Sequence, residues 1–306
     1  MVVTVSALLI AGPTASGKSG LAIALAQELG GTVVNADSMQ VYRDLRVLSA
    51  RPSADEEASV PHLMFGHVDA DANYSVGLWL ADVEQAIARV REEGRLPVIC
   101  GGTGMYFKAL TQGLSPIPPV PDDVRARVRA EGEGVPVGEL HARLAALDPA
   151  MAARLRPSDP QRILRALEVF EATGQSLATY QGARGAPLLE LEDCAAIFLA
   201  PERAQVMAAI DGRFDAMLRA GALGEVAALA ARKLDTALPC MRAHGVPHLV
   251  AHLRGELSLA EAAERGKADT RAYAKRQFTF ARNQLGGFAQ VKLEKARAAI
   301  LAKSRI

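Results

Sequence analysis

The sequence predicts an α/β protein: a parallel β-sheet with helices on both faces, into which a second, helical part is inserted. Two observations support this fold class. Near the N-terminus, short apolar segments typical of buried strands alternate with longer segments of helical periodicity. Farther along, this alternation is interrupted by a stretch of helical segments without a clear strand. With 306 residues, half of them hydrophobic, the chain can bury one large core and a smaller one.

The N-terminal elements follow from apolar spacing and from the residues that end each segment. Gly30 and Gly31 end the first helix, and a turn at Gly94 ends the next one. Strands that alternate with helices in this way pair in parallel. The predicted strands are Val2–Ala11, Thr32–Asn35 and Leu96–Cys100, and the predicted helices are Lys18–Leu29 and Ser75–Glu93.

The composition changes near Leu114, where Ser115–Pro121 has the proline content of a linker. Helical segments follow up to about Leu191, and Ala195–Leu199 then has the apolar character of a strand returning to the first domain. We therefore predict a core domain in two parts, 1–116 and 193–306, and a helical insertion, 117–192. The second part of the core is expected to contain the helices Arg203–Ala220 and Ala260–Gln284.

The composition also restricts the class of protein. Cys100, Cys194 and Cys240 are far apart and form no Cys-x-x-Cys pair, which argues against a disulfide framework or a zinc site. The apolar N-terminal segment lacks a basic start and a cleavage site, and no segment approaches the length of a membrane span. We expect a cytoplasmic protein without a membrane partner.

Charge is distributed unevenly along the chain. The net charge is only +1, but from Arg265 onward there are eleven Lys and Arg residues against two acids, a local charge of +9 that leaves −8 on residues 1–264. A basic region of this kind is typical of a surface that binds phosphate groups, as in nucleic acids, although a solvated basic tail would look the same.

The residues Gly12 to Ser19, Gly-Pro-Thr-Ala-Ser-Gly-Lys-Ser, match the phosphate-loop pattern G-x-x-x-x-G-K-[ST]. They stand between a predicted strand and a predicted helix, the context in which such a loop wraps its backbone N–H groups around phosphate oxygens. Lys18 would supply charge to the terminal phosphate and Ser19 would ligate Mg²⁺. The core is therefore expected to be of the P-loop NTPase-like kind.

The usual Mg²⁺-binding acid of ATP-dependent P-loop enzymes is missing from the predicted strand ends. Leu96–Cys100 runs into Gly101 and Gly102, and Ala195–Leu199 runs toward Glu202, a weak candidate. Either the acid lies somewhere unusual in the chain, or the loop holds a diphosphate and not ATP. After the second strand, Asp37 stands where ligands of open α/β sheets gather; it suits a general base, and Gln40 could read a base edge, although a capping Asp and a solvated Gln fit equally well.

Several motifs together identify a resemblance. The phosphate loop, the Asp37-Ser-Met-Gln-Val-Tyr segment and the Gly101-Gly-Thr-Gly-Met-Tyr segment closely resemble the tRNA dimethylallyltransferase (isopentenyl-tRNA transferase) family. Later segments resemble it too, in the same order and over nearly the whole chain: Asp159–Phe170, Arg213–Leu218 and Thr270–Arg282.

The resemblance implies a reaction and its catalytic residues. The family transfers the dimethylallyl group of dimethylallyl diphosphate to N6 of adenosine 37 in the anticodon stem-loop of tRNA, in an A36–A37 context, with Mg²⁺ as the cofactor. Asp37 would be the general base, with Thr103 nearby, and Arg213 would hold the leaving diphosphate. The diphosphate would lie on Gly12, Pro13, Thr14, Ala15, Ser16, Gly17, Lys18 and Ser19, with Ser19 as the metal ligand.

The resemblance also implies the residues that contact tRNA and an enzyme that acts as a monomer. Those residues are Asp37, Ser38, Met39, Gln40, Thr103, Arg125, Gln161, Arg162, Ile163, Leu164, Arg165, Arg242, Lys275, Arg276, Gln277 and Arg282. The chain departs from the family pattern at Ser49–Pro52 and at His244–His248, where a Tyr and an Arg are replaced. Two alternatives remain open: a P-loop small-molecule kinase that uses ATP, and an RNA-binding protein without catalysis.

Overall fold

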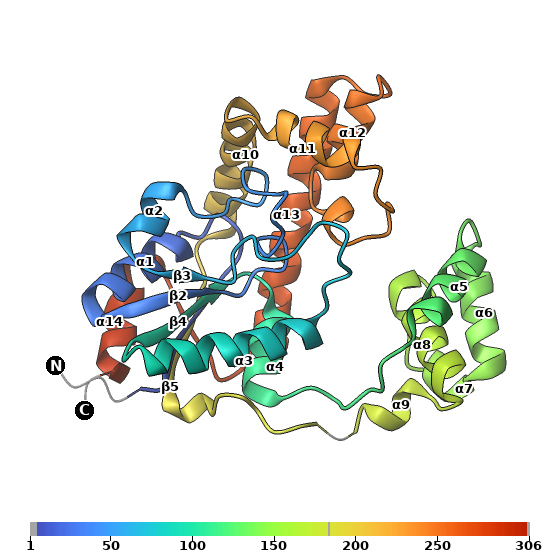
Figure 1. Ribbon diagram of the computed structural model, residues 1–306, viewed down its shortest axis with the longest axis horizontal. Coiled ribbons are helices and arrows are strands. Elements are labelled where there is room, and N and C mark those ends of the chain that lie inside the picture. The colour runs from blue at the N-terminus through green and yellow to red at the C-terminus, as the bar shows by residue number, and fades with distance from the viewer. Residues whose placement is uncertain (1–4, 183, 305–306) are drawn as a thin grey trace. The chain divides into compact units, whose positions relative to one another are not determined.

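The computed structural model describes residues 5–182 and 184–304, and its strands form one parallel sheet (Figure 1). The strands are β1 (Ala7–Ala11), β2 (Gly31–Asn35), β3 (His62–Leu63), β4 (Leu96–Gly101), β5 (Cys194–Leu199) and β6 (Ala289–Val291). Their order is β3-β2-β4-β1-β5-β6, and every pair is parallel. The predicted α/β fold class is confirmed. The two short edge strands β3 and β6 were not predicted.

Alternate residues of the central strands face opposite layers of helices, as the period of a strand requires. Leu8 and Ile10 of β1 pack with α1 (Lys18–Leu29) and α14 (Leu293–Ser304) on one face. Leu9 of β1 packs on the other face with α3 (Val76–Glu92), α4 (Gly104–Gln112) and the end of α13 (Leu259–Gln284). Since β1 is buried on both faces, its sequence is continuously apolar.

The predicted elements agree with the structure to within a few residues. Helix α1 has the predicted bounds, and Gly30 ends it in the left-handed conformation at φ 67°. Gly31, predicted to help end the helix, instead begins β2, where an added Cβ would lie 2.8 Å from the Val98 side chain. The N-terminal strand is shorter than Val2–Ala11, and the first four residues of the chain lie outside the described residues.

The chain divides into two compact units, which are described separately. The first comprises 1–111 and 188–306 and contains the sheet; the second comprises 112–187, so each boundary falls a few residues before the predicted one. Besides the elements above, the first unit contains α2 (Ala54–Ser59), the 3₁₀ helix Leu191–Asp193, α10 (Arg203–Arg219), α11 (Ala222–Ala231), the 3₁₀ helix Cys240–Arg242 and α12 (Val246–Leu253).

A second apolar cluster of the first unit joins the segment after β2 to helices α10 to α13. Val41 and Leu45 from that segment contact a group of helix residues that includes Phe214 of α10 and Val226 of α11. The cluster fixes the residues that follow β2 against helices that are distant in the sequence. It therefore attaches the carboxyl edge of the sheet to α10 and α13, which contribute the other side of the site described below.

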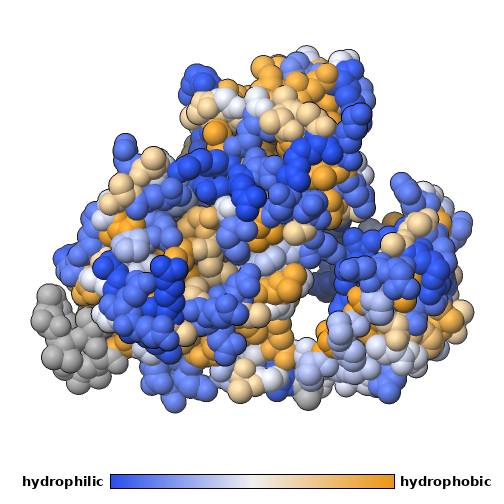
Figure 2. Space-filling model, viewed as in Figure 1, coloured by the Kyte–Doolittle hydropathy of each residue, from blue (hydrophilic) through white to orange (hydrophobic). Residues whose placement is uncertain are grey.

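The second unit is a helical bundle with its own core. Its helices are α5 (Asp122–Gly132), α6 (Val137–Leu147), α7 (Pro149–Ala152), α8 (Pro160–Thr173) and α9 (Leu177–Tyr180). Val128, Leu144 and Ile163 are fully buried in it. On the face that Figure 2 shows, each unit presents a mixture of hydrophilic and apolar residues. Among the described residues no helix is long and apolar enough to cross a membrane.

The contact between α10 and α13 predicts the effect of two glycine substitutions. Gly266 of α13 lies against Phe214, and an added Cβ would stand 2.5 Å from the ring. Gly212 of α10 has open space around it. We expect Gly266→Ala to lower the free energy of unfolding by about 1–3 kcal/mol through overpacking. The matched change Gly212→Ala should raise it by roughly 0.5–1 kcal/mol, because alanine favours a helix interior. Urea unfolding of the two variants measures both changes, and equal effects would contradict this packing.

Candidate functional site

The phosphate loop connects the end of β1 to the start of α1 and depends on two glycines. Gly17 precedes the helix at φ 83°, and a Cβ there would lie 2.8 Å from Leu293. A Cβ on Gly12 would lie 2.9 Å from Oγ of Ser16. Ala15 also has a positive φ, 60°. Left-handed residues in a glycine-rich turn before a helix are typical of anion-binding loops.

The side chains of the loop are arranged for an anion. Oγ of Ser16 is buried and has no hydrogen-bond partner among the described residues. Lys18 donates from Nζ to the Pro13 carbonyl at 3.1 Å. Desolvation lowers the pKa of Lys18 from its usual value, and the carboxylate of Asp37 opposes that shift. A buried hydroxyl and a desolvated ammonium group are both stabilised by a bound phosphate oxygen.

Arg213 of α10 also contacts the phosphate loop. Its guanidinium donates to the hydroxyl of Thr14. Burial lowers the pKa of Arg213 from its usual value, while Asp37 acts in the opposite direction. Two cations, Lys18 and Arg213, are thus held in a desolvated region beside a single carboxylate. That arrangement favours a ligand with more than one negative charge.

Asp37 follows β2 and is oriented by Asn35, which is fully buried. The amide nitrogen of Asn35 donates to the carbonyls of Asp37 and Met64, at 2.9 and 3.1 Å, and its Oδ1 accepts from the Asp37 backbone at 2.9 Å. The carboxylate of Asp37 accepts from the Met39 backbone through Oδ1 at 3.0 Å. The other oxygen, Oδ2, lies close to Gly102 of the neighbouring loop.

The loop after β4 meets the Asp37 segment at close range. A Cβ on Gly101 would lie 2.0 Å from the Ala36 carbonyl oxygen, so this contact requires glycine. The Thr103 backbone donates to the same carbonyl at 3.1 Å, and its hydroxyl accepts from the Ser38 backbone at 2.9 Å. Thr103 and Ser38 hydroxyls are also 3.2 Å apart. Asp37, Ser38 and Thr103, which were predicted from separate motifs, therefore form one cluster.

Gln277 of α13 joins the two loops. Its Oε1 accepts from the Thr14 backbone at 3.0 Å and its Nε2 donates to the Gly102 carbonyl at 2.8 Å. The side chain is only 7% exposed. Gln277 was predicted to contact tRNA; both ends of its amide are engaged inside the protein, and the contact stays a prediction.

Tyr273 is a site residue that was not predicted. Its hydroxyl lies within hydrogen-bonding reach of the Thr103 and Gln277 side chains, and burial, followed by the charge of Asp37, raises its pKa from the usual value. Its ring contacts His244 at 4.8 Å between centroids and lies under the Arg276 guanidinium at 5.6 Å. Its spacing in the sequence could have identified it: Tyr273 is one helical turn before Gln277 on α13, so both side chains lie on the same face of the helix.

The comparisons with known proteins agree with this geometry. The model of the family described as "IPP transferase" matches residues 40–284, and that described as "Isopentenyl transferase" matches residues 5–65.

The chain belongs to the IPP transferase family.

Curated relatives are similar over nearly their whole length. The tRNA dimethylallyltransferase of Methylocella silvestris is 63% identical over 297 residues, which is 97% of this chain and 98% of the relative. That of Beijerinckia indica is 62% identical, with the same coverage.

Solved structures of the family are also similar. A full-length tRNA isopentenylpyrophosphate transferase of Bacillus halodurans is 30% identical with a TM-score of 0.67, and 98% of each chain is covered. A eukaryotic dimethylallyltransferase acting on tRNA is 26% identical with a TM-score of 0.78, covering 97% of this chain and 77% of that one.

The segment after Asp37, which carries a family motif, packs largely inward. The Nε2 of Gln40 donates to the carbonyls of Ser49 and Ala50 at 3.0 and 2.8 Å. Because its amide nitrogen is engaged, Gln40 cannot form the predicted pair of hydrogen bonds to a base in this conformation. Met39 packs partly buried against the second apolar cluster of the first unit.

The family residues of the helical unit have different environments. Ile163, predicted to contact tRNA, has its side chain fully buried in the core of that unit. Leu164 is partly buried against the same core. The charged residues lie at the surface beside acids: Arg125 pairs with Asp122 at 2.6 Å, Arg162 with Asp159 at 3.4 Å and Arg165 with Glu168 at 3.4 Å. Gln161 is exposed.

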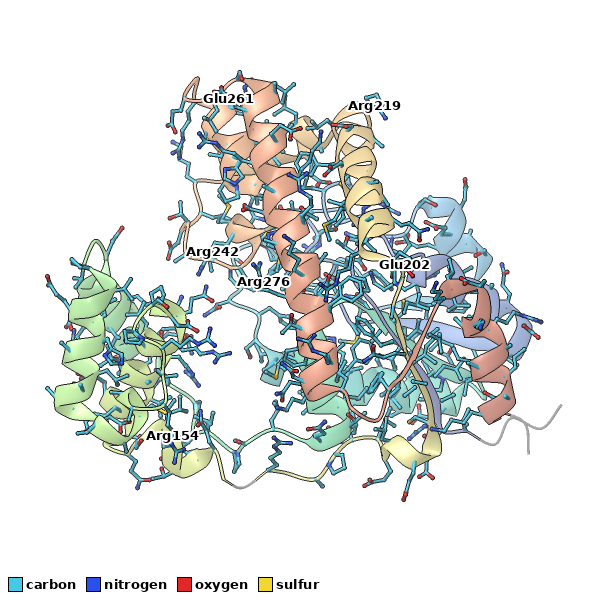
Figure 3. All side chains as sticks on the ribbon, turned by 180° about the vertical axis from the view of Figure 1, so that it is seen from behind. Arg154, Glu202, Arg219, Arg242, Glu261 and Arg276 are labelled. Carbon is cyan, nitrogen blue, oxygen red and sulfur yellow. The ribbon has the colours of Figure 1, made fainter. Side chains whose placement is uncertain are left out.

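The basic C-terminal region is partly neutralised by acids from other segments. The ion pairs are Lys267 with Asp215 and Glu264, Arg271 with Asp211, Lys292 with Glu202 and Arg297 with Glu28. Lys275, Arg276 and Arg282 of α13 are exposed, and Figure 3 labels Arg276 on this helix together with Arg242 of the segment before α12. The predicted basic surface is thus narrower than the sequence suggested. Arg305 lies outside the described residues.

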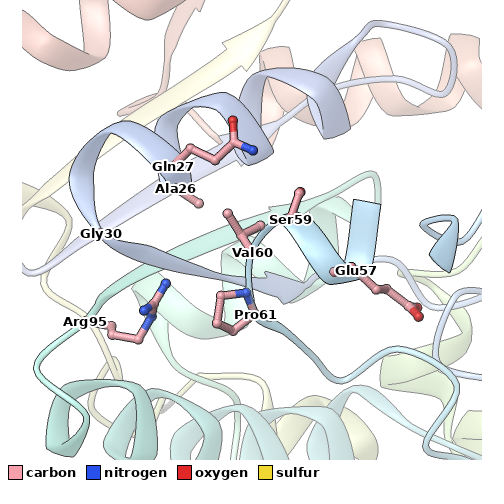
Figure 4. Close-up of a pocket in the computed structure, with 9 residues that line it drawn as sticks. Ala26, Gln27, Gly30, Glu57, Ser59, Val60, Pro61 and Arg95 are labelled. Carbon is pink, nitrogen blue, oxygen red and sulfur yellow. The ribbon is translucent and has the colours of Figure 1, made fainter. Parts of the chain in front are cut away.

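A surface pocket lies elsewhere on the sheet unit (Figure 4). It is lined by the end of α1, the end of α2 with the segment that follows it, and Arg95. Arg95 donates to the Thr32 hydroxyl and the Gly31 carbonyl, at 3.0 and 2.6 Å. None of the residues that line this pocket belongs to the phosphate loop or to the Asp37 cluster. The pocket is therefore separate from the candidate site.

The bridge made by Gln277 predicts a loss of stability and of phosphate binding. Gln277→Ala leaves the Thr14 N–H and the Gly102 carbonyl without their partner, which should lower the free energy of unfolding by about 1–3 kcal/mol. Binding of inorganic diphosphate, measured by calorimetry, should weaken because the loop loses its anchor. Thr279→Ala, an exposed position on the same helix, is the control and should change neither value. A Gln277→Ala protein as stable as the control would exclude this role.

Proposed function

We propose that the chain is a tRNA dimethylallyltransferase, which transfers the dimethylallyl group of dimethylallyl diphosphate to N6 of adenosine 37 in tRNAs with an A36–A37 sequence. One observation carries the proposal: a phosphate loop with two desolvated cations stands beside the Asp37–Thr103 cluster. A diphosphate leaving group and a proton acceptor are thereby brought to one site. This is what an attack by an amine on an allyl diphosphate needs.

The diphosphate would lie on the loop Gly12–Ser19. The buried Ser16 hydroxyl and the Lys18 ammonium group would contact its oxygens, and the Arg213 guanidinium would exchange its bond to Thr14 for a bond to the phosphate. A planar guanidinium holds phosphate oxygens in a bidentate way and stabilises the charge that develops as the diphosphate departs.

Ser19, at the start of α1 and exposed, fits a Mg²⁺ site, since its hydroxyl is the position that holds the metal in phosphate loops. The orphaned Ser16 hydroxyl indicates that the loop is built for the phosphate that would share the metal. When bound, Mg²⁺ supplies positive charge to the diphosphate.

The chemical step would be a substitution at C1 of the allyl group. The adenine N6 attacks C1, a C–N bond forms, and the bond between C1 and the diphosphate oxygen breaks. Asp37 takes the proton that N6 loses. Asn35 holds the backbone of Asp37, the Met39 backbone N–H holds its carboxylate, and Thr103 is held beside it by Ser38. General base catalysis of this kind contributes typically ~10²–10⁴-fold.

The tRNA would be bound by basic side chains at the surface, since phosphate contacts position RNA and unpaired bases are read at the site. In the sheet unit these are Lys275, Arg276 and Arg282 of α13, together with Arg242. In the helical unit, for which we propose a role in tRNA binding, they are Arg125, Arg162 and Arg165, with Gln161. Extrusion of adenosine 37 from its stack would bring N6 to Asp37, as chemistry on a base requires.

Product analysis tests this function. Purified protein, Mg²⁺, dimethylallyl diphosphate and unmodified tRNA should give tRNA that contains N6-dimethylallyladenosine, detected by mass spectrometry of nucleosides. Asp37→Ala should reduce the rate by ~10²–10⁴-fold and leave tRNA affinity nearly unchanged. Tight tRNA binding without any prenylated nucleoside would support the RNA-binding alternative. Turnover of ATP with a small-molecule acceptor would support the kinase alternative.

The basic residues of α13 make a second prediction. Lys275→Ala combined with Arg276→Ala should weaken tRNA binding at every sequence and reduce the slope of log affinity against log salt concentration by about 1–2. Filter binding at several salt concentrations measures this slope. The paired control is Arg297→Ala, whose partner is Glu28, and it should leave the slope unchanged. If both variants have the same slope, Lys275 and Arg276 do not contribute to tRNA binding.

A further inference from the structure

Behind the phosphate loop is a small enclosed cavity that the proposed reaction does not use. It has a volume of about 10 Å³, room for about one water molecule, and Lys18 and Ser19 form part of its wall. Ile23, Val33, Pro52 and Phe65 make the rest of the wall largely apolar. The remaining polar side chains that line it are those of Gln40, His62 and Cys100.

His62, of the short edge strand β3, offers this cavity a hydrogen-bond acceptor. Its Nδ1 lies 2.9 Å from the carbonyl oxygen of Val60. Because a carbonyl only accepts, Nδ1 must carry the proton, and in the neutral ring Nε2 is then the acceptor. Nε2 is shielded from solvent and has no hydrogen-bond partner among the described residues. An unpartnered buried acceptor costs stability, so it indicates a donor that arrives with a ligand.

Gln40 is fixed so that it offers a second acceptor. The carbonyls of Ser49 and Ala50 both accept from its side chain, which identifies the contacting atom as the amide nitrogen. Its carbonyl oxygen is what remains for the cavity. Cys100 does not compete for this role as a thiolate, because burial raises the pKa of its thiol to about 12 and it stays protonated.

This cavity lies at the place where P-loop nucleotide enzymes hold a carboxylate. In those enzymes an acid at the end of the neighbouring strand supports the magnesium site. β1 here pairs with β4, which ends at Cys100 and Gly101, and with β5, which ends at Leu199. Among the described residues no group of three acids, histidines or cysteines forms a metal cluster. Mg²⁺ retains several water molecules when it binds, and those waters need acceptors.

We propose that His62 is a positioning residue of the metal–diphosphate site, assisted by Gln40. Its Nε2 accepts a hydrogen bond from a water of the hydration shell of the divalent cation at Ser19. The inference rests on the proposed function only for the presence of a diphosphate and its cation. A neutral imidazole and an amide then orient the cation without adding the negative charge of an acid, which suits a site that must release a diphosphate after each turnover.

The experiment compares His62→Phe with His62→Gln, using inorganic diphosphate as the probe and calorimetry with Mg²⁺ or with EDTA. Phenylalanine keeps the shape of the ring without an acceptor, and glutamine restores an acceptor near Nε2. We expect His62→Phe to lose about 10-fold of the diphosphate affinity measured with Mg²⁺ and to bind as the wild type does in EDTA, as loss of an outer-shell partner predicts. His62→Gln should remain close to the wild type in both buffers.

The control is His67→Phe, an exposed position of the same segment, which should be neutral. An equal loss with Mg²⁺ and with EDTA, normal binding of His62→Phe, or a wild type whose binding ignores Mg²⁺ would each overturn the proposal. The assay contains no tRNA and no prenyl group. Absence of a prenylated product would therefore refute the proposed function while leaving a Mg²⁺-specific loss in His62→Phe intact, and the reverse result would refute the role of His62 alone.

Discussion

The site depends on the amide of Gln277, which ties together the two loops at the carboxyl ends of β1 and β4. One end of this side chain accepts from Thr14 in the phosphate loop and the other donates to Gly102. Because α13 also supplies Tyr273 to Thr103, a single helix sets both the position of the phosphate loop and the neighbourhood of Asp37. The relative position of the leaving group and the base is thereby determined by short hydrogen bonds to one rigid element.

The electrostatics of the site favour an anion before any ligand enters. Lys18 and Arg213 both have pKa values lowered by desolvation, and the pKa-raising effect of Asp37 opposes this in each case. Two desolvated cations beside one carboxylate leave excess positive charge, and desolvation makes that charge more costly than it would be in water. A bound diphosphate relieves this cost. Part of the binding free energy of the leaving group therefore comes from the desolvation of Lys18 and Arg213 in the folded loop and α10.

Periodicity predicted most of the fold, and motif matching found residues that the structure brings together around the phosphate loop. The differences from the prediction have physical causes. The edge strands β3 and β6 are too short to give an apolar pattern, and pairing with β2 and β5 alone defines them. Ile163 stands in a motif whose neighbours are surface residues, but the period of α8 turns it into the core. Ion pairs such as Arg271 with Asp211 join residues far apart in the chain, so a count of charges along α13 overestimated its exposed basic surface.

The environment of Trp79 gives this protein a built-in optical reporter. It is the only tryptophan of the chain, it is fully buried, and it stacks on Tyr106 with the ring centroids 4.1 Å apart and the planes 8° apart. Its indole nitrogen donates at 3.0 Å to the carbonyl of Asn35, the residue whose side chain orients Asp37. All indole emission of the protein thus comes from a side chain that contacts Asn35, the neighbour of the proposed base. Any rearrangement of the Asn35–Asp37 segment when substrate enters therefore changes the surroundings of this single fluorophore.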